Sequence, residues 1–143
     1  MKKCLAFTAA MLLFCNPVLG QSYDLLTRAE TGDVSAQVML GDMFAAGEGV
    51  PLDYVEAAHW YLLAAKRGIA NAQLSLGLLY SRGQGVIQNM EITYQWTSIA
   101  AAQGAQDAIE ARDLIGGQLD AETRARAQHL ANLCFESQYR QCE

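Results

Sequence analysis

The stretch Gly47–Gly68, GEGVPLDYVEAAHWYLLAAKRG, returns later in the same chain as Gly83–Gly104, GQGVIQNMEITYQWTSIAAAQG. The matching residues are always 36 positions apart, as in the pairs Gly47 and Gly83, Trp60 and Trp96, and Ala64 and Ala100. A fixed period of roughly 20–50 residues is typical of proteins built by stacking copies of one small unit. The sequence therefore predicts a repeat protein.

Each copy predicts a pair of helices joined by a glycine-containing turn. In the first helix of each copy, apolar and small residues recur at the spacing of one buried helical face; they are Ala36, Leu40, Met43 and Phe44, then Ala72, Leu76, Leu79 and Tyr80. Glycines such as Gly47 and Gly83 end these helices, because glycine adopts positive φ without steric cost. Asp53 and Asn89 then supply the side-chain oxygens expected at the N-cap of the second helix.

Gly41 and Gly77 lie inside the predicted buried face of the first helices. Glycine costs about 1 kcal/mol relative to alanine within a helix, so its recurrence in register predicts the close approach of another helix backbone. In the second helices, Trp60 and Trp96 each stand near small alanines, a combination that lets antiparallel helices interlock.

One helix pair cannot bury its own apolar face, whereas stacked pairs can. We therefore expect an all-α solenoid with capping helices at both ends. The predicted division is a signal peptide at 1–20, an N-terminal cap helix segment at 21–31, repeats at 32–67 and 68–103, and a degenerate third repeat with a C-terminal capping helix at 104–143. Asp120 is the expected N-cap of that last helix, whose arginines and glutamine give it the polar outer face of a solenoid end.

The first 20 residues have the order of a secretory signal peptide: Lys2 and Lys3, an apolar run from Leu5 to Phe14, then Asn16, Pro17 and the small Gly20. The run is much shorter than the roughly 20 apolar residues of a transmembrane helix, so no membrane span is predicted. A lipoprotein would instead carry its lipid on Cys15, but the bulky Phe14 precedes that cysteine. We expect cleavage near Gly20 and a periplasmic or secreted protein.

Charge argues against a polyanionic partner. The chain has 10 Lys and Arg against 15 Asp and Glu, and cleavage would remove two lysines, giving 8 minus 15, or −7. A protein that binds phosphate backbones needs a basic surface, so nucleic acid is an unexpected partner, and an anionic membrane surface equally so. The apolar content of 52% argues against disorder.

Cys134 and Cys142 are the two cysteines that would remain after cleavage, and in an oxidising compartment we expect them to form a disulfide. On one continuous helix they would lie about 12 Å apart along the axis, whereas a disulfide requires Cα atoms within about 7 Å. The chain must therefore turn between them. Free thiols and a redox or metal pair are the alternatives, but the C-x-x-C spacing is absent and only His59 and His129 could complete a metal site.

These features resemble the Sel1-like repeat family, whose units combine an A-Q-x-x-L-G helix, a G-x-G-V turn and a second helix with tryptophan and paired alanines. Matching residues in the first unit include Ala36-Gln37, Leu40-Gly41, Gly47, Trp60 and Ala64-Ala65, and the second unit matches at Ala72-Gln73, Leu76-Gly77, Gly83, Trp96 and Ala100-Ala101. Thr93 departs from the usual alanine, and the third unit is degenerate. The resemblance covers about 32–133 and implies a right-handed superhelix of helix pairs, similar to tetratricopeptide arrays.

The resemblance also implies a non-catalytic module that holds another protein on its concave face, with no cofactor and no metal. By spacing, the variable positions of the first helices would line that face; they are Met39, Asp42, Ala46, Ser75, Leu78 and Arg82. A purely solvated helix face is the alternative for these residues. The partner class stays open between an envelope protein and a secreted antibacterial toxin, the latter making this chain an immunity protein.

A cell-wall hydrolase or β-lactamase is the enzymatic alternative, because some cysteine-rich members of the family have been considered for such activity. The required motifs are missing: Leu63 stands three positions before Lys66, so there is no Ser-x-x-Lys in the mature chain, and no G-x-S-x-G occurs. We expect packing or surface roles for His59 and His129. Glu48 is the most conspicuous carboxylate, but Gln84 occupies the equivalent position. The sequence predicts no enzyme.

Overall fold

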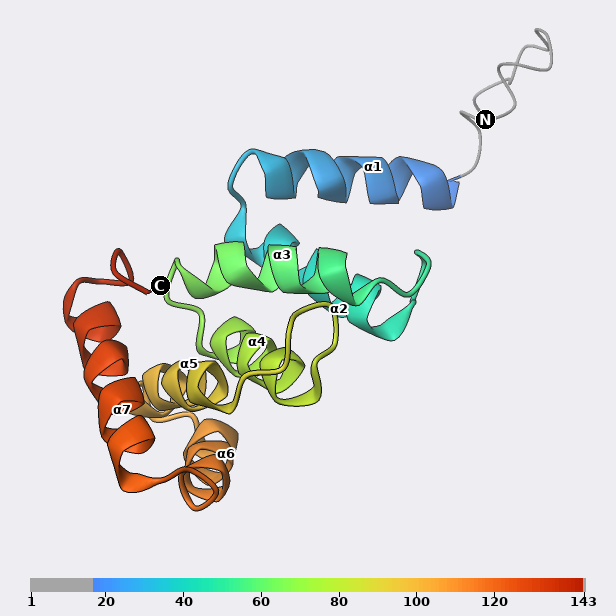
Figure 1. The fold of residues 1–143 in the computed structure, drawn as a ribbon. Helices are drawn as coiled ribbons and strands as arrows, with labels where there is room; N and C mark the ends of the chain where they lie inside the picture. The colour runs from blue at the N-terminus through green and yellow to red at the C-terminus, as the bar shows by residue number, and fades with distance from the viewer. Residues whose placement is uncertain (1–16, 143) are drawn as a thin grey trace, which may run out of the picture.

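A computed structural model describes residues 17–142, which form α-helices and contain no β-strand. The helices are α1 (Pro17–Glu30), α2 (Val34–Ala46), α3 (Tyr54–Ala65), α4 (Ala70–Arg82), α5 (Met90–Ala102), α6 (Gln106–Gly116) and α7 (Ala121–Glu136). They stack in chain order as an all-α solenoid, with α1 at one end and α6 and α7 at the other (Figure 1). The predicted all-α repeat architecture is confirmed.

The 36-residue period governs where helices begin. Val34, Ala70 and Gln106 start α2, α4 and α6, and Tyr54 and Met90 start α3 and α5. From α1 to α6 each helix packs on its neighbours in the chain, and α7 packs on α5. The third unit, which is degenerate in sequence, therefore keeps the register of its first helix, α6, whereas α7 begins at Ala121, earlier than the period would place it.

The predicted N-caps are present. The Asp53 carboxylate accepts hydrogen bonds from the backbone N–H groups of Val55 and Glu56, and the Asn89 side chain accepts from those of Glu91 and Ile92. Asp120 accepts from Thr123 at the start of α7. At the other ends, α2 and α4 stop at Gly47 and Gly83, which have left-handed φ values of 69° and 64°.

Gly41 and Gly77 are both tightly packed, but not in the same way. A Cβ atom on Gly41 would lie 2.6 Å from the ring of Tyr61, so a side chain fills that space and the prediction of a close helix backbone is wrong there. A Cβ on Gly77 would lie 3.2 Å from the Thr97 methyl group and 3.4 Å from the Thr93 carbonyl oxygen of α5. Only Gly77 allows the expected close approach of a neighbouring helix.

Small residues form the contacts between helices. Within residues 17–142, eight alanines have an exposure of 0%, namely Ala36, Ala57, Ala64, Ala65, Ala72, Ala100, Ala108 and Ala127. Between them lie Trp60 and Trp96, both buried, each in the core cluster of its own region. Buried alanines let the helices approach closely, and the large indoles fill the remaining space.

The chain reverses direction after α7 in a segment that we call the C-terminal loop, residues 137–142. Gln138 and Tyr139 have positive φ, and a disulfide joins Cys134 to Cys142 across Cα atoms 4.5 Å apart. This is the turn that the predicted pairing requires. The Tyr139 ring folds back onto Gly68, where a Cβ atom would lie 2.5 Å from it.

The predicted signal peptide falls mainly outside the described residues. Its last part, including the expected cleavage position near Gly20, belongs to α1, which runs continuously from Pro17 to Glu30. Within residues 17–142, no helix combines the length and apolar character needed to cross a membrane.

Candidate protein-binding surface

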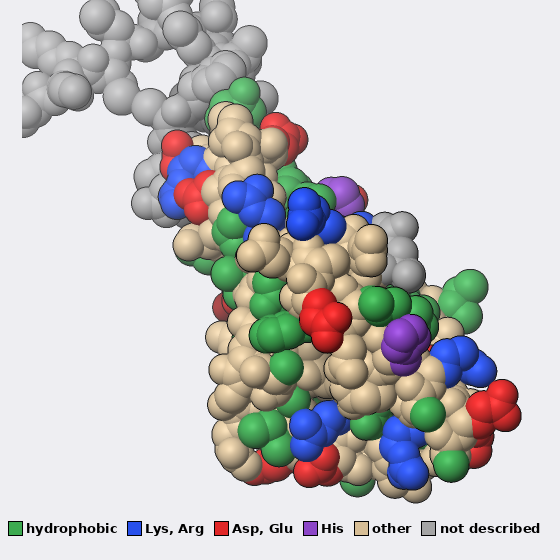
Figure 2. All heavy atoms as spheres, turned by 90° about the vertical axis from the view of Figure 1, so that its left-hand side faces the viewer, with side chains coloured by type: hydrophobic (Ala, Val, Ile, Leu, Met, Phe, Trp, Pro, Cys, Tyr) green, Lys and Arg blue, Asp and Glu red, His purple; other side chains and the backbone are tan. Residues whose placement is uncertain are grey.

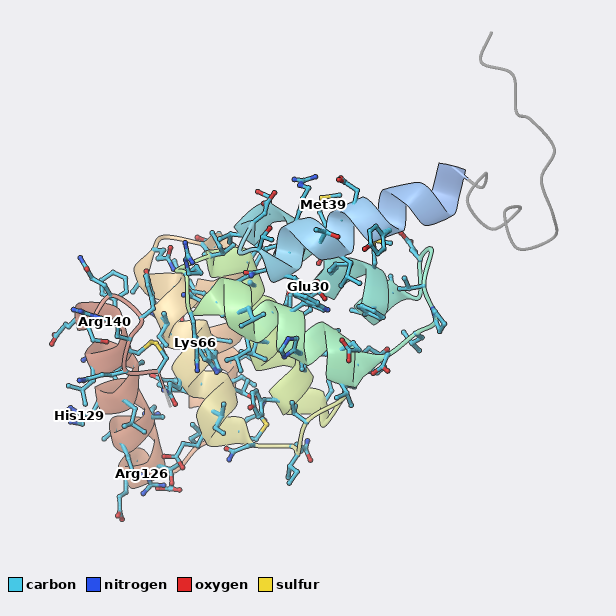
Figure 3. All side chains as sticks on the ribbon, turned by 90° about the horizontal axis from the view of Figure 1, so that it is seen from above. Glu30, Met39, Lys66, Arg126, His129 and Arg140 are labelled. Atoms are coloured by element: carbon cyan, nitrogen blue, oxygen red, sulfur yellow. A yellow bond between two sulfur atoms is a disulfide. The ribbon has the colours of Figure 1, made fainter. Side chains whose placement is uncertain are left out.

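The six residues predicted to bind a partner occupy matching positions on two helices. Residues 39, 42 and 46 are on α2, and residues 75, 78 and 82 are on α4, each set following one face of its helix. We call these six residues the α2–α4 surface. Met39 is 51% exposed, Asp42, Ala46 and Arg82 are exposed, and Ser75 and Leu78 are half-buried. Met39 projects outward at the edge of the molecule in Figure 3.

Tyr61 contacts one half of this surface. It extends from α3, and its hydroxyl donates a 2.7 Å hydrogen bond to Asp42 Oδ1. Burial raises the pKa of the Tyr61 hydroxyl above its usual value, and the hydrogen bond to Asp42 raises the pKa further. The phenol therefore stays neutral and holds the Asp42 carboxylate in place.

Tyr61 is a site residue that the sequence reasoning missed. The repeat pattern gave no signal for it, because the equivalent position one unit later is Thr97, which is fully buried and donates its hydroxyl to the Thr93 carbonyl within α5. Gly41 provides the room for the Tyr61 ring. The hydrogen bond from a second-helix side chain to Asp42 therefore has no equivalent at position 97 of the second repeat.

The surface continues onto α6. Ala111 and Leu114 stand 36 residues after Ser75 and Leu78, and Leu114 is 67% exposed. The sequence reasoning omitted them because the third unit lacks the family motif. The 36-residue offset alone would have identified both positions.

The residues that the enzymatic alternative would need are dispersed. His59 is exposed, with its ring 5.1 Å from that of the adjacent Trp60, and His129 lies on the outside of α7 (Figure 3). Among residues 17–142, no three His, Cys, Asp or Glu side chains converge as a metal site would require.

Two exposed ion pairs connect helices rather than forming part of the binding surface. Arg28 on α1 pairs with Asp33, the N-cap of α2, at 2.6 Å, and Arg126 on α7 pairs with Glu91 on α5 at 2.6 Å. The hydrogen bond from Arg28 lowers the pKa of Asp33, and that from Arg126 lowers the pKa of Glu91. Both carboxylates are therefore ionised at neutral pH.

Comparisons with solved structures return proteins of this fold. The protein c5321, a protective antigen of uropathogenic Escherichia coli strains that displays an SLR fold, is 24% identical with a TM-score of 0.77; the match covers 92% of this chain and 28% of that one. The present chain thus spans just over a quarter of the length of c5321. A Sel1 repeat protein from Oxalobacter formigenes is 27% identical with a TM-score of 0.55, over 76% of this chain and 98% of that one.

A comparison with curated proteins finds no match. The family model for the Sel1 repeat matches residues 34–69 and 70–104. These two matches begin where α2 and α4 begin, and each contains one helix pair and the start of the next unit. The chain belongs to the Sel1 repeat family.

Proposed function

We propose that this protein is a non-catalytic module of the periplasm or the extracellular space that holds another protein on its α2–α4 surface. Sel1 repeats are in general protein–protein interaction modules. The observation that carries the proposal is the hydrogen bond from Tyr61 to Asp42, which holds a charged group of the surface in place on the same helix as the exposed Met39. A surface held in place before binding loses less conformational entropy when a partner docks.

The composition of the surface fits a protein partner. It combines apolar side chains with single charges on Asp42 and Arg82, and Leu114 extends it onto α6. Interfaces between proteins commonly place apolar anchors at the centre and polar groups around them. The Cys134–Cys142 disulfide supports export, because disulfides persist in oxidising compartments.

The test is photo-crosslinking in cells that export the protein. A photo-reactive residue at Leu78 should capture one partner, which mass spectrometry identifies, whereas the same residue at the exposed Ala125 of α7 should capture much less of it. The partner is then purified and titrated against Met39→Glu and Leu114→Glu. We expect each substitution to weaken binding at least tenfold, which corresponds to about 1.4 kcal/mol, with an unchanged helical circular-dichroism spectrum.

Two results would contradict the proposal. One is equal capture from Leu78 and Ala125, which indicates collision rather than docking. The other is a purified partner whose affinity is unaffected by both substitutions, because the α2–α4 surface would then lie outside the interface.

A further inference from the structure

An apolar groove opens beside the α2–α4 surface at the first repeat junction. Val34, Ser35 and Val38 line it from the first turns of α2, and Ile69 lines it from the N-cap position of α4. Asp42 lies one helical turn beyond Val38, so the groove and the α2–α4 surface adjoin along α2.

The size of the groove limits what it can hold. Its volume is about 260 Å³. Pockets for drug-sized molecules occupy roughly 300–1,000 Å³, whereas a cavity of about 150 Å³ admits benzene. The groove therefore suits one aliphatic or aromatic side chain rather than a larger small molecule.

The next junction differs from this one. The residues equivalent to Val34, Val38 and Ile69 are Ala70, Leu74 and Ala105, which pack together with Ile109. At the first junction the equivalent of Ile109 is Gln73, which is fully buried and donates its amide to the Ala65 carbonyl oxygen at 3.0 Å. The residues that line the groove are thus specific to the first junction and are not repeated at the next one.

Two arginines stand at the edge next to Ile69. Arg67 precedes Gly68, and Arg140 follows Tyr139, whose ring packs on Gly68. Both arginines are exposed, and neither takes part in an ion pair within residues 17–142. Figure 2 shows Lys and Arg side chains close together near the top of the face that is the left-hand side of Figure 1, and Figure 3 places Arg140 on that side.

This local positive charge contrasts with the chain as a whole, whose formal net charge is −5. An acidic protein repels an acidic partner at long range, so such a partner would dock where the two exposed arginines, Arg67 and Arg140, lie near an apolar contact. Arginine is well suited to this task, because its planar guanidinium pairs bidentately with carboxylates.

We propose that the groove receives an aliphatic or aromatic side chain from an acidic segment of the partner protein, with Arg67 and Arg140 pairing with the flanking carboxylates. The inference rests on the proposed function and names the chemistry of the partner. The apolar side chain is the anchor, and the arginines select acidic neighbours and fix the direction of the segment.

Three labelled peptides test the proposal by fluorescence anisotropy on the intact, oxidised protein. The first is Asp-Glu-Leu-Phe-Glu-Asp; the second replaces its acidic residues with Lys, and the third replaces Leu-Phe with Gly-Ser. We expect the first to bind at least tenfold more tightly than either of the others, and its binding to weaken as salt is raised. NMR shifts should appear at Val34, Val38 and Ile69.

Protein variants then locate the binding. Ser35→Trp fills the groove, and Arg67→Glu reverses one charge at its edge without touching a buried side chain. Each should weaken the first peptide at least tenfold. Arg112→Glu is the matched control, because it makes the same charge change on α6, where Arg112 pairs only with its neighbour Asp113. The control should bind the peptide with nearly unchanged affinity.

The proposal is overturned if the lysine peptide binds as tightly as the acidic one, or if Arg112→Glu weakens binding as much as Arg67→Glu. Its failure is distinguishable from failure of the proposed function. A partner captured at Leu78 whose affinity survives Ser35→Trp and Arg67→Glu leaves the binding module intact and removes the groove from its interface. An acidic peptide that binds in the groove while Leu78 captures nothing supports the groove and contradicts the α2–α4 surface.

Discussion

At the scale of single residues, Gly41 is the position where substitution has the clearest steric consequence. A Cβ atom there would lie 2.6 Å from two carbons of the Tyr61 ring, which is buried and held by its hydrogen bond to Asp42. Overpacking a buried site typically costs about 1–3 kcal/mol. The gain of about 1 kcal/mol in helix propensity offsets only part of this cost. We expect Gly41→Ala to lower the free energy of unfolding, as measured by urea denaturation.

Gly77→Ala is the matched comparison. Its Cβ would lie 3.2 Å from the Thr97 methyl group, so a shift of a few tenths of an ångström relieves the contact. The gain of about 1 kcal/mol in helix propensity then offsets most of the remaining cost. An equally small effect of the two substitutions would show that Tyr61 moves aside freely and that its hydrogen bond to Asp42 does not hold the ring rigidly.

The sequence predicted the interactions between residues that lie close together in the chain. Asp53, Asn89 and Asp120 act on backbone groups two or three positions away, so their capping role is readable from the order of residues. Tyr61 acts on Asp42, which lies 19 positions earlier on another helix. Such contacts depend on how the helices are placed in space, and the order of residues in one sequence does not specify that placement.

At the scale of elements, the C-terminal loop is closed by the disulfide and packed on the first repeat junction. Cys134 and Cys142 are buried in the same core cluster as Ala65, Ala72 and Leu76, which belong to α3 and α4. The Cys–Cys spacing predicted that the chain turns, but the contact of Tyr139 with Gly68 joins positions 71 residues apart and left no local signal. The loop therefore connects the last helix to the middle of the solenoid.

Reduction of the disulfide should destabilise the protein. Closing a loop of this length removes entropy from the unfolded chain worth about 2–3 kcal/mol in the chain-entropy model. We expect dithiothreitol to lower the free energy of unfolding by about this amount in urea denaturation. The Cys142→Ser variant should show the lower stability without reductant and no further change when reductant is added. A stability that reductant leaves unchanged would mean that the loop is not held by the disulfide in solution.

The 36-residue period that predicts the starts of α2 to α5 also predicts the start of α6, although the sequence of α6 lacks most of the family motif. The reason is that helix starts follow from turn length, which the chain preserves between Gly68 and Gly104, whereas motif residues follow from packing partners that change at the end of a solenoid. The start of α6 could therefore be predicted from the period, whereas the identity of its packing residues could not.

At the scale of the whole molecule, carboxylates with lowered pKa values lie at both ends of the solenoid. Hydrogen bonding to Arg28 lowers the pKa of Asp33 between α1 and α2, and hydrogen bonding to Arg126 lowers that of Glu91 between α5 and α7. Hydrogen bonds from the Thr123 backbone and side chain lower the pKa of Asp120 at the start of α7. In each case the ionised form is favoured more strongly in the folded protein than in the unfolded chain.

The sign of the pH dependence follows from these shifts. A carboxylate with a depressed folded-state pKa contributes stability that is present above its unfolded pKa, which is about 4, and is lost as pH falls through its folded value. Mild acidification also relieves the repulsion within a chain of net charge −5, which acts in the opposite direction. We therefore expect a nearly flat stability between pH 7 and about 5 and a decline below about pH 4.

Urea-denaturation midpoints from pH 7 to pH 3 measure this profile, and Glu91→Gln separates the two effects. The amide removes the titrating group between α5 and α7, so the variant should be less stable than the parent at pH 7 and lose less stability on acidification, and the two curves should converge toward pH 3. Parallel curves would mean that Glu91 does not contribute to the acid response. A parent stability that rises continuously down to pH 3 would mean that relief of net repulsion outweighs the loss of all three carboxylates, and that these interactions at the two ends hold the solenoid together only weakly.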